Sequence, residues 1–211
     1  MMKEKLTPRW FIIKLTGILF AIYSAYNIFL IVRDGSAMPP VGIFISALVS
    51  LLFALLAAFA WTSEVKNVRF MMIRKTVMII VLLTIFALKL RLVNRVMALL
   101  NFSKTQNVLY VAAYFLTLAA LLMLFVYYAF ILRNLPLYPK ASVFLPIAVI
   151  IGFVGCVVCE ALLFFGFGFG LETSPLRTLV IRPVFYLGFI GLCVYFLFPP
   201  PLMEDLIDYY T

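Results

Sequence analysis

Long apolar runs, separated by short stretches that carry the charges, dominate the pattern of this chain. Five almost uncharged runs of about 20 to 25 residues cover 11–32, 41–61, 108–132, 141–165 and 179–198. A transmembrane helix needs about 20 mainly apolar residues, whereas a transmembrane strand alternates in polarity, which these runs do not. The pattern therefore predicts helices that cross a membrane.

A sixth and weaker span covers residues 70–92. Its uncharged core extends only from Thr76 to Leu88, between Lys75 and Lys89. That interval is about 21 Å long at the helical rise, and the two lysine side chains can extend several Å further to the headgroups. We therefore expect a thin third helix. The fold class predicted is an all-α integral membrane protein, with residues 1–211 in one domain of about six transmembrane helices.

The longest connection, residues 93–104, has an amphipathic pattern. Its apolar face holds Val93, Val96, Met97 and Leu100, and its polar face holds Arg91, Asn94, Arg95 and Asn101. Such a segment is expected to lie in the membrane interface, as an extension of the third helix.

Basic residues near the first span predict its orientation. Lys3, Lys5, Arg9 and Lys14 precede or begin it, whereas Arg33 alone follows it. Basic residues favour the cytoplasmic side, so we expect the N-terminus there, and six spans return the acidic tail to the same side. The first run is too long for a signal peptide and should remain as an anchor. A multi-pass protein of a bacterial plasma membrane is expected.

Composition excludes several classes of function. The net charge of +9 comes from residues at span ends, where orientation and anionic headgroups account for them, so nucleic acid is not an expected partner. The chain has no histidine, no P-loop and no dinucleotide fingerprint. We therefore expect no metal, no cofactor and no enzymatic activity.

Small residues recur at every fourth position of the first two predicted helices. They are Gly17, Ala21 and Ala25 in the first helix, and Ser46, Ser50, Ala54 and Ala58 in the second. Small side chains let helix backbones approach closely in lipid, where association depends on van der Waals packing. The pattern predicts either that the two helices pack on each other or that one stripe faces a separate membrane subunit.

The segment Ala21-Ile22-Tyr23-Ser24-Ala25 is an AxxxA motif in the first helix of this 211-residue chain. In this motif and in its expected six helices, the chain is similar to the substrate-binding subunits of energy-coupling-factor vitamin transporters. The resemblance implies that the first helix docks on a shared transmembrane subunit and that external loops close over a vitamin. No residues match a particular vitamin site.

Polar side chains gather in the outer halves of two predicted helices. Tyr23, Tyr26 and Asn27 share a face of the first helix, and Tyr110, Tyr114 and Thr117 share a face of the fourth. Convergent aromatic and amide groups are typical of a small-molecule pocket, although an interfacial aromatic belt explains the outermost tyrosines equally well. Asn27 favours the pocket, because polar groups within a span are usually paired or functional.

Glu160 is the sole acidic residue within a predicted span, where an isolated charge costs several kcal/mol. By helix rise it lies about 10 Å outward from the centre of its span, and Arg182 lies about 9 Å outward in the next. Lys89 ends the third span at a similar level. We expect an intramembrane ion pair of Glu160 with Arg182, near Lys89. Alternatively, Glu160 belongs to the polar cavity as a proton or cation site.

Cys156 and Cys159 form a CxxC motif on one face of the fifth predicted helix. Vitamin K epoxide reductases and the quinone-linked disulfide-generating enzymes carry a similar motif near the outer end of a span. This chain lacks their second pair, and Cys193 is about 12 Å away in depth by helix rise. Cysteine is also an ordinary small apolar residue in buried helices.

The sequence leaves three functions open. The first is the binding or transport of a small solute, alone or as a subunit of a larger transporter. The second is a non-catalytic structural or assembly subunit of a membrane complex. The third, which the missing thiol partner disfavours, is a membrane thiol-redox enzyme.

Overall fold

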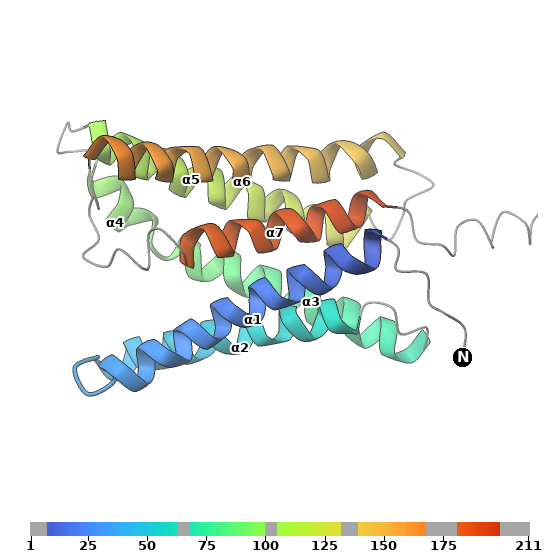
Figure 1. Ribbon diagram of the computed structural model, residues 1–211, viewed down its shortest axis with the longest axis horizontal. Coiled ribbons are helices and arrows are strands. Elements are labelled where there is room, and N and C mark those ends of the chain that lie inside the picture. The colour runs from blue at the N-terminus through green and yellow to red at the C-terminus, as the bar shows by residue number, and fades with distance from the viewer. Residues whose placement is uncertain (1–7, 63–67, 100–104, 132–138, 168–180, 199–211) are drawn as a thin grey trace, which may run out of the picture.

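The computed structural model describes residues 8–62, 68–99, 105–131, 139–167 and 181–198, and this part of the chain is helical apart from short turns (Figure 1). The first helices are α1 (Pro8–Asp34), α2 (Pro40–Trp61), α3 (Val68–Leu90) and the short α4 (Val93–Ala98). Then come α5 (Thr105–Val126), which continues into a π-helical turn η2 (Tyr127–Ile131), α6 (Pro139–Phe167) and α7 (Arg182–Leu197).

Five of these helical stretches are long and apolar enough to cross a membrane, which indicates a multi-pass membrane protein. The third stretch, which the sequence predicts to be thin, is one of the five, and it continues through the turn at residues 91–92 to give 26 residues, Ile73 to Ala98, with charged residues near both ends. The short helix is instead α7, with 16 residues, or about 24 Å. Its predicted span, 179–198, begins with two residues that lie outside the described part of the chain.

The long helices run back and forth along one bundle, so the start of α1 and the end of α7 lie at the same end (Figure 1). The guanidinium of Arg9 joins them, because it donates a hydrogen bond of 3.0 Å to the Tyr195 hydroxyl. Helix α1 packs against α2 and α7, and α6 packs against α5 and α7. Helix α3 contacts α2 and α5, so the bundle has no separate domains within the described residues.

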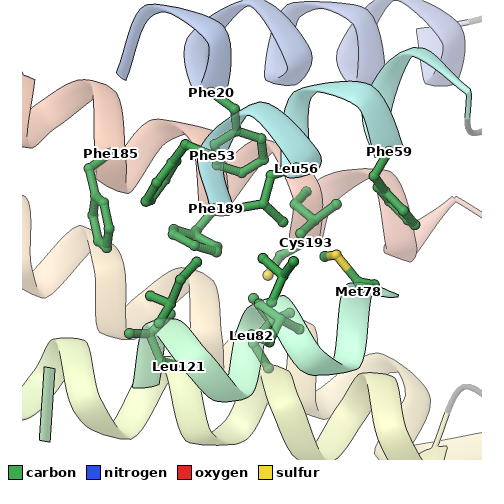
Figure 2. Close-up of a cluster of buried hydrophobic side chains, with 14 of the residues drawn as sticks. Phe20, Phe53, Leu56, Phe59, Met78, Leu82, Leu121, Phe185, Phe189 and Cys193 are labelled. Carbon is green, nitrogen blue, oxygen red and sulfur yellow. The ribbon is translucent and has the colours of Figure 1, made fainter. Parts of the chain in front are cut away.

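Aromatic side chains fill the centre of the bundle (Figure 2). The Phe20 ring of α1 lies 5.8 Å from Phe53 of α2 and 5.3 Å from Phe189 of α7, measured between ring centroids. Phe189 also stacks on Phe153 of α6, at 5.4 Å. Rings at these separations attract one another beyond their simple burial, so four helices share one rigid centre.

Two glycines allow the close approach of α7 to α1. A Cβ atom at Gly188 would lie 2.6 Å from Phe20, and one at Gly191 would collide with the Thr16 hydroxyl. Any larger residue would push the two helices apart. In the same way, Gly152 of α6 faces Ala120 of α5, where an added Cβ would come within 3.2 Å.

The predicted stripes of small residues only partly form the contact between α1 and α2. Gly17 is buried against Trp61, and Ser50 exchanges hydrogen bonds of 2.9 to 3.1 Å with Ser24, which lies outside the stripe. Ser46 is half-buried. The remaining members are exposed on the surface of the bundle, namely Ala21, Ala25, Ala54 and Ala58. A spacing of four residues turns by about 40° per step on a helix of 3.6 residues per turn, so the stripe leaves the contact face.

The amphipathic segment after α3 forms the short helix α4 rather than a smooth extension of α3, because a turn at residues 91–92 separates the two. Val96 of its apolar face is buried against Val111, Tyr114 and Leu118, whereas Met97 of the same face is exposed. Helix α4 therefore packs on α5 through Val96. Residues 100–104 of the predicted segment lie outside the described residues.

Candidate solute cavity

A cavity of about 150 Å³ lies between five helices, in the half of the bundle opposite to the contact of Arg9 with Tyr195. Its wall comes from the second half of α1, the end of α3, the first half of α5, the end of α6 and the start of α7. The lining residues are Tyr23, Tyr26, Asn27, Leu30, Lys89, Leu92, Tyr110, Ala113, Tyr114, Thr117, Glu160, Ile181, Arg182, Phe185 and Tyr186.

The structure brings all the polar candidates from the sequence to this one wall. Each of the seven proposed cavity residues lines it, namely Tyr23, Tyr26, Asn27, Tyr110, Tyr114, Thr117 and Glu160. Lys89 and Arg182, which were placed at the same depth from helix rise, also line it. The antiparallel order of the helices produces this convergence, because residues late in α1, α3 and α6 meet residues early in α5 and α7.

The sequence reasoning missed six lining residues: Leu30, Leu92, Ala113, Ile181, Phe185 and Tyr186. A signal existed for Tyr186, because it follows Arg182 by four residues and such residues share a helix face. The apolar members carry no comparable signal, since leucine and phenylalanine are abundant on every face of these helices.

Glu160 and Arg182 form an ion pair in the cavity wall. One guanidinium nitrogen of Arg182 donates to both carboxylate oxygens of Glu160, at 2.6 and 2.7 Å. Their side chains are only 8% and 18% exposed, so little water screens the pair. The Tyr186 hydroxyl adds a longer hydrogen bond of 3.4 Å to the same carboxylate. The guanidinium carbon also lies 5.5 Å from the centre of the Tyr110 ring.

Lys89 reaches the cavity from the last turn of α3. Its ammonium nitrogen lies 5.2 Å from the centre of the Phe185 ring, a cation–π distance. The backbone carbonyl of Lys89 accepts a hydrogen bond from the Tyr114 hydroxyl, which ties the end of α3 to α5. These two contacts place the ammonium group at the wall.

Asn27 and Thr117 use one polar group each to bond their own helix. The Asn27 side-chain nitrogen donates to the Tyr23 carbonyl at 2.7 Å, and the Thr117 hydroxyl donates to the Ala113 carbonyl at 2.8 Å. For Asn27 this hydrogen bond identifies which amide atom faces its own helix, which leaves the side-chain oxygen as an acceptor for other partners.

Cys156 lies behind this wall, and neither cysteine of the CxxC motif is bridged. Cys156 is fully buried, 3.3 Å from the Thr117 hydroxyl and 3.4 Å from the Ala113 carbonyl. Cys156, Cys159 and Cys193 are all free thiols. Among the residues that the structure describes, no group of three or more histidine, cysteine, aspartate or glutamate side chains could hold a metal ion.

Comparison of the chain with protein-family models, with curated proteins and with solved structures gives no match in any of the three. The function therefore has to be argued from the cavity itself.

Proposed function

We propose that this protein is a multi-pass protein of a bacterial plasma membrane that binds or transports a small solute, alone or as a subunit of a larger transporter. In this proposal α7 also crosses the membrane, and both termini are cytoplasmic. The cavity then lies in the outer half of the membrane. No step of enzymatic chemistry is part of this function.

One observation carries the proposal: ten polar or charged residues from five helices converge on a single cavity. Burying such groups in a membrane protein is costly unless they pair or serve a ligand. A scaffold could reach the same stability more simply by filling the space with apolar side chains. Small-molecule sites use convergent polar groups to orient their ligands, and this wall has more of them than the usual, mostly apolar one.

The enclosed part of the cavity, about 150 Å³, holds a group of the size of benzene. Because the cavity is partly open, this volume does not limit the size of the whole solute.

The exposed alanines favour the second candidate function, a structural or assembly subunit. Ala21 and Ala25 of α1, with Ala54 and Ala58 of α2, lie on the surface of the bundle, where a partner helix could approach closely. This role is compatible with solute binding, because the cavity lies on the other side of α1, toward α5 and α7.

A ligand screen with a cavity-filling variant tests the proposal. The melting temperature of the purified full chain is measured against a panel of small anionic, zwitterionic, neutral and cationic metabolites. At least one member should raise it, because a ligand that binds only the folded state stabilises that state. Asn27→Trp fills the cavity from α1 and should abolish the shift.

Ile28→Trp is the matched control, because Ile28 is the next residue along α1 and is exposed on the outside of the bundle. It should leave the ligand shift unchanged. A wild-type protein that no panel member stabilises, and that co-purifies with another membrane chain, would contradict solute binding and favour the assembly role.

A further inference from the structure

Two basic side chains from different helices meet the C-terminal end of α2. The Lys14 ammonium group of α1 donates a hydrogen bond of 2.7 Å to the Trp61 carbonyl, and the Arg74 guanidinium of α3 donates one of 2.6 Å to the Thr62 carbonyl. These carbonyls belong to consecutive residues, so both side chains are held at the same turn. The last carbonyls of a helix lack partners inside it and carry partial negative charge, which explains why cations gather there.

This pair of basic residues, the interface cluster, lies at the depth of the lipid headgroups. The Lys14 ammonium nitrogen is 5.0 Å from the centre of the Trp61 ring and 5.8 Å from that of Trp10. Tryptophan is enriched at the boundary between headgroups and hydrocarbon, and Trp61 is 55% exposed. Lys14 and Arg74 each lie six residues after the first residue of their helix, or about 9 Å. The cluster therefore belongs to the membrane interface.

The two acidic side chains of the described residues lie elsewhere. Asp34, the last residue of α1, pairs with Arg33 at 2.6 Å, and Glu160 pairs with Arg182 in the cavity wall. Both pairs lie toward the opposite end of the bundle. Within the described part of the chain, the interface cluster is therefore bonded to carbonyl groups and not to a carboxylate.

The remaining donors of the cluster suit a lipid phosphate. The bonds to α2 use one of the three N–H groups of Lys14 and one of the five of Arg74. At this depth the bilayer supplies phosphodiester oxygens as acceptors, and basic pockets between transmembrane helices bind anionic headgroups. Next to Lys14, an apolar surface of α1 is available to the acyl chains. Its residues Leu15, Ile18 and Ile22 are 44 to 46% exposed.

We propose that the interface cluster binds the phosphodiester of an anionic phospholipid, with the Trp61 ring beside the headgroup. The bound lipid joins α1 and α3 at the end of α2. A zwitterionic lipid suits the site less well, because its headgroup brings a cation that the two basic side chains repel. The site is separate from the proposed solute cavity, since neither Lys14 nor Arg74 lines that cavity.

The two tryptophans of the chain provide a direct measurement, because both rings lie beside Lys14. The full chain is reconstituted in phosphatidylcholine vesicles with increasing fractions of phosphatidylglycerol brominated near the glycerol end of its acyl chains. This lipid should quench tryptophan fluorescence at a mole fraction at least about fivefold lower than equally brominated phosphatidylcholine, which is the contribution of about one basic residue at an anionic surface. Equal quenching by the two lipids would overturn the proposal, and this comparison needs no variant.

Substitutions then locate the site. Lys14→Gln and Arg74→Gln should each reduce the preference for phosphatidylglycerol about fivefold, whereas Lys14→Arg should retain it within about twofold. Lys75→Gln is the matched control, because Lys75 is exposed and follows Arg74 directly in α3. It should change the preference by less than about twofold. An equal loss in Lys75→Gln would indicate diffuse attraction to the membrane surface and would overturn a defined site.

Two further measurements identify the acceptor. Millimolar inorganic phosphate should leave the quenching unchanged, and displacement of the brominated lipid would assign the cluster to a free phosphate instead. Glu64 follows Trp61 by three positions and lies outside the described residues. Glu64→Gln should change the preference by less than about twofold, and a gain of about fivefold or more would identify this carboxylate as the partner of the cluster in place of a lipid.

Discussion

Arg182 at the first position of α7 and Glu160 near the end of α6 are joined through a single guanidinium nitrogen, which donates to both carboxylate oxygens. The two residues are 22 positions apart in the chain and belong to adjacent antiparallel helices. Their pairing closes one side of the cavity wall. It also allows two charges to lie where little water reaches them.

Removing one member of this ion pair should lower the free energy of unfolding more than removing both members. Glu160→Gln or Arg182→Gln leaves one buried charge, which typically costs about 3 to 5 kcal/mol. The double substitution leaves no charge and should cost less than the sum of the two single changes. The free energy of unfolding in detergent, measured for all four proteins, gives the coupling energy.

Additive effects in this double-mutant cycle would show that the two side chains act independently. Glu160 would then be better described as a solvated proton or cation site. The Arg91→Gln protein serves as a control for the loss of a basic residue at the same end of the bundle, and we expect its stability to change by less than about 0.5 kcal/mol.

Gly188 should tolerate no larger side chain. Gly188→Ala places a methyl group 2.6 Å from the Phe20 ring, and overpacking of this kind typically costs about 1 to 3 kcal/mol. Gly166→Ala is the control on α6, because nothing lies within 4 Å of the added group. That change should be neutral or stabilising by up to about 1 kcal/mol, since alanine favours a helix over glycine. Thermal unfolding in detergent compares the two.

The close contact at Gly188 can also be tested by changing its partner, Phe20. Phe20→Leu, combined with Gly188→Ala, replaces the ring by a smaller side chain and should recover part of the lost stability. If Gly188→Ala is as harmless as Gly166→Ala, the close approach of α1 and α7 is wrong.

The two thiols of the CxxC motif should be dispensable. Cys156→Ala combined with Cys159→Ala removes two small side chains, and the cost in stability should be about 1 kcal/mol or less. Solute binding should persist, since neither residue lines the cavity. Loss of a thiol- or quinone-coupled activity in this variant, with folding intact, would establish the redox enzyme instead.

Reporter proteins fused to the two termini should both give cytoplasmic signals. The basic residues before and within the start of α1 favour that side, and the meeting of Arg9 with Tyr195 puts the start of α1 and the end of α7 at one end of the bundle. Reporter fusions at residue 1 and residue 211 in intact cells measure this. Signals from opposite sides would mean that one of the six helices does not cross.

Much of the cavity could be predicted from the sequence, because the depth of a residue in the membrane follows from its position along its helix. Each residue's height follows from its distance to the middle of an apolar run, at 1.5 Å per residue. Height alone placed Glu160, Arg182 and Lys89 at one level and put the two tyrosine clusters in the same half. It could not show Phe185 or Ala113 in the wall, because apolar residues at that height occur on every face.

The wrong predictions about helix contacts have the same physical origin, because height along a helix does not give the rotation of that helix. The repeat of small residues fixed a spacing along α1 and α2 but not the rotation of each helix, so Ala21 and Ala54 were candidates for the contact and lie exposed instead. The pairing of Ser24 with Ser50 depends on that rotation. The third span was not among the wrong predictions, because its predicted bounds, 70–92, agree with those of α3, Val68–Leu90.

The helical class, the approximate spans and the height of each polar group follow from the amino-acid sequence alone, because apolar length and helix rise are local properties. Which helices touch, and which way each faces, depends on tertiary packing. These choices depend on close contacts such as Gly188 against Phe20, which involve residues far apart in the chain. The cavity is therefore a product of packing, assembled from residues whose chemistry and depth could already be predicted.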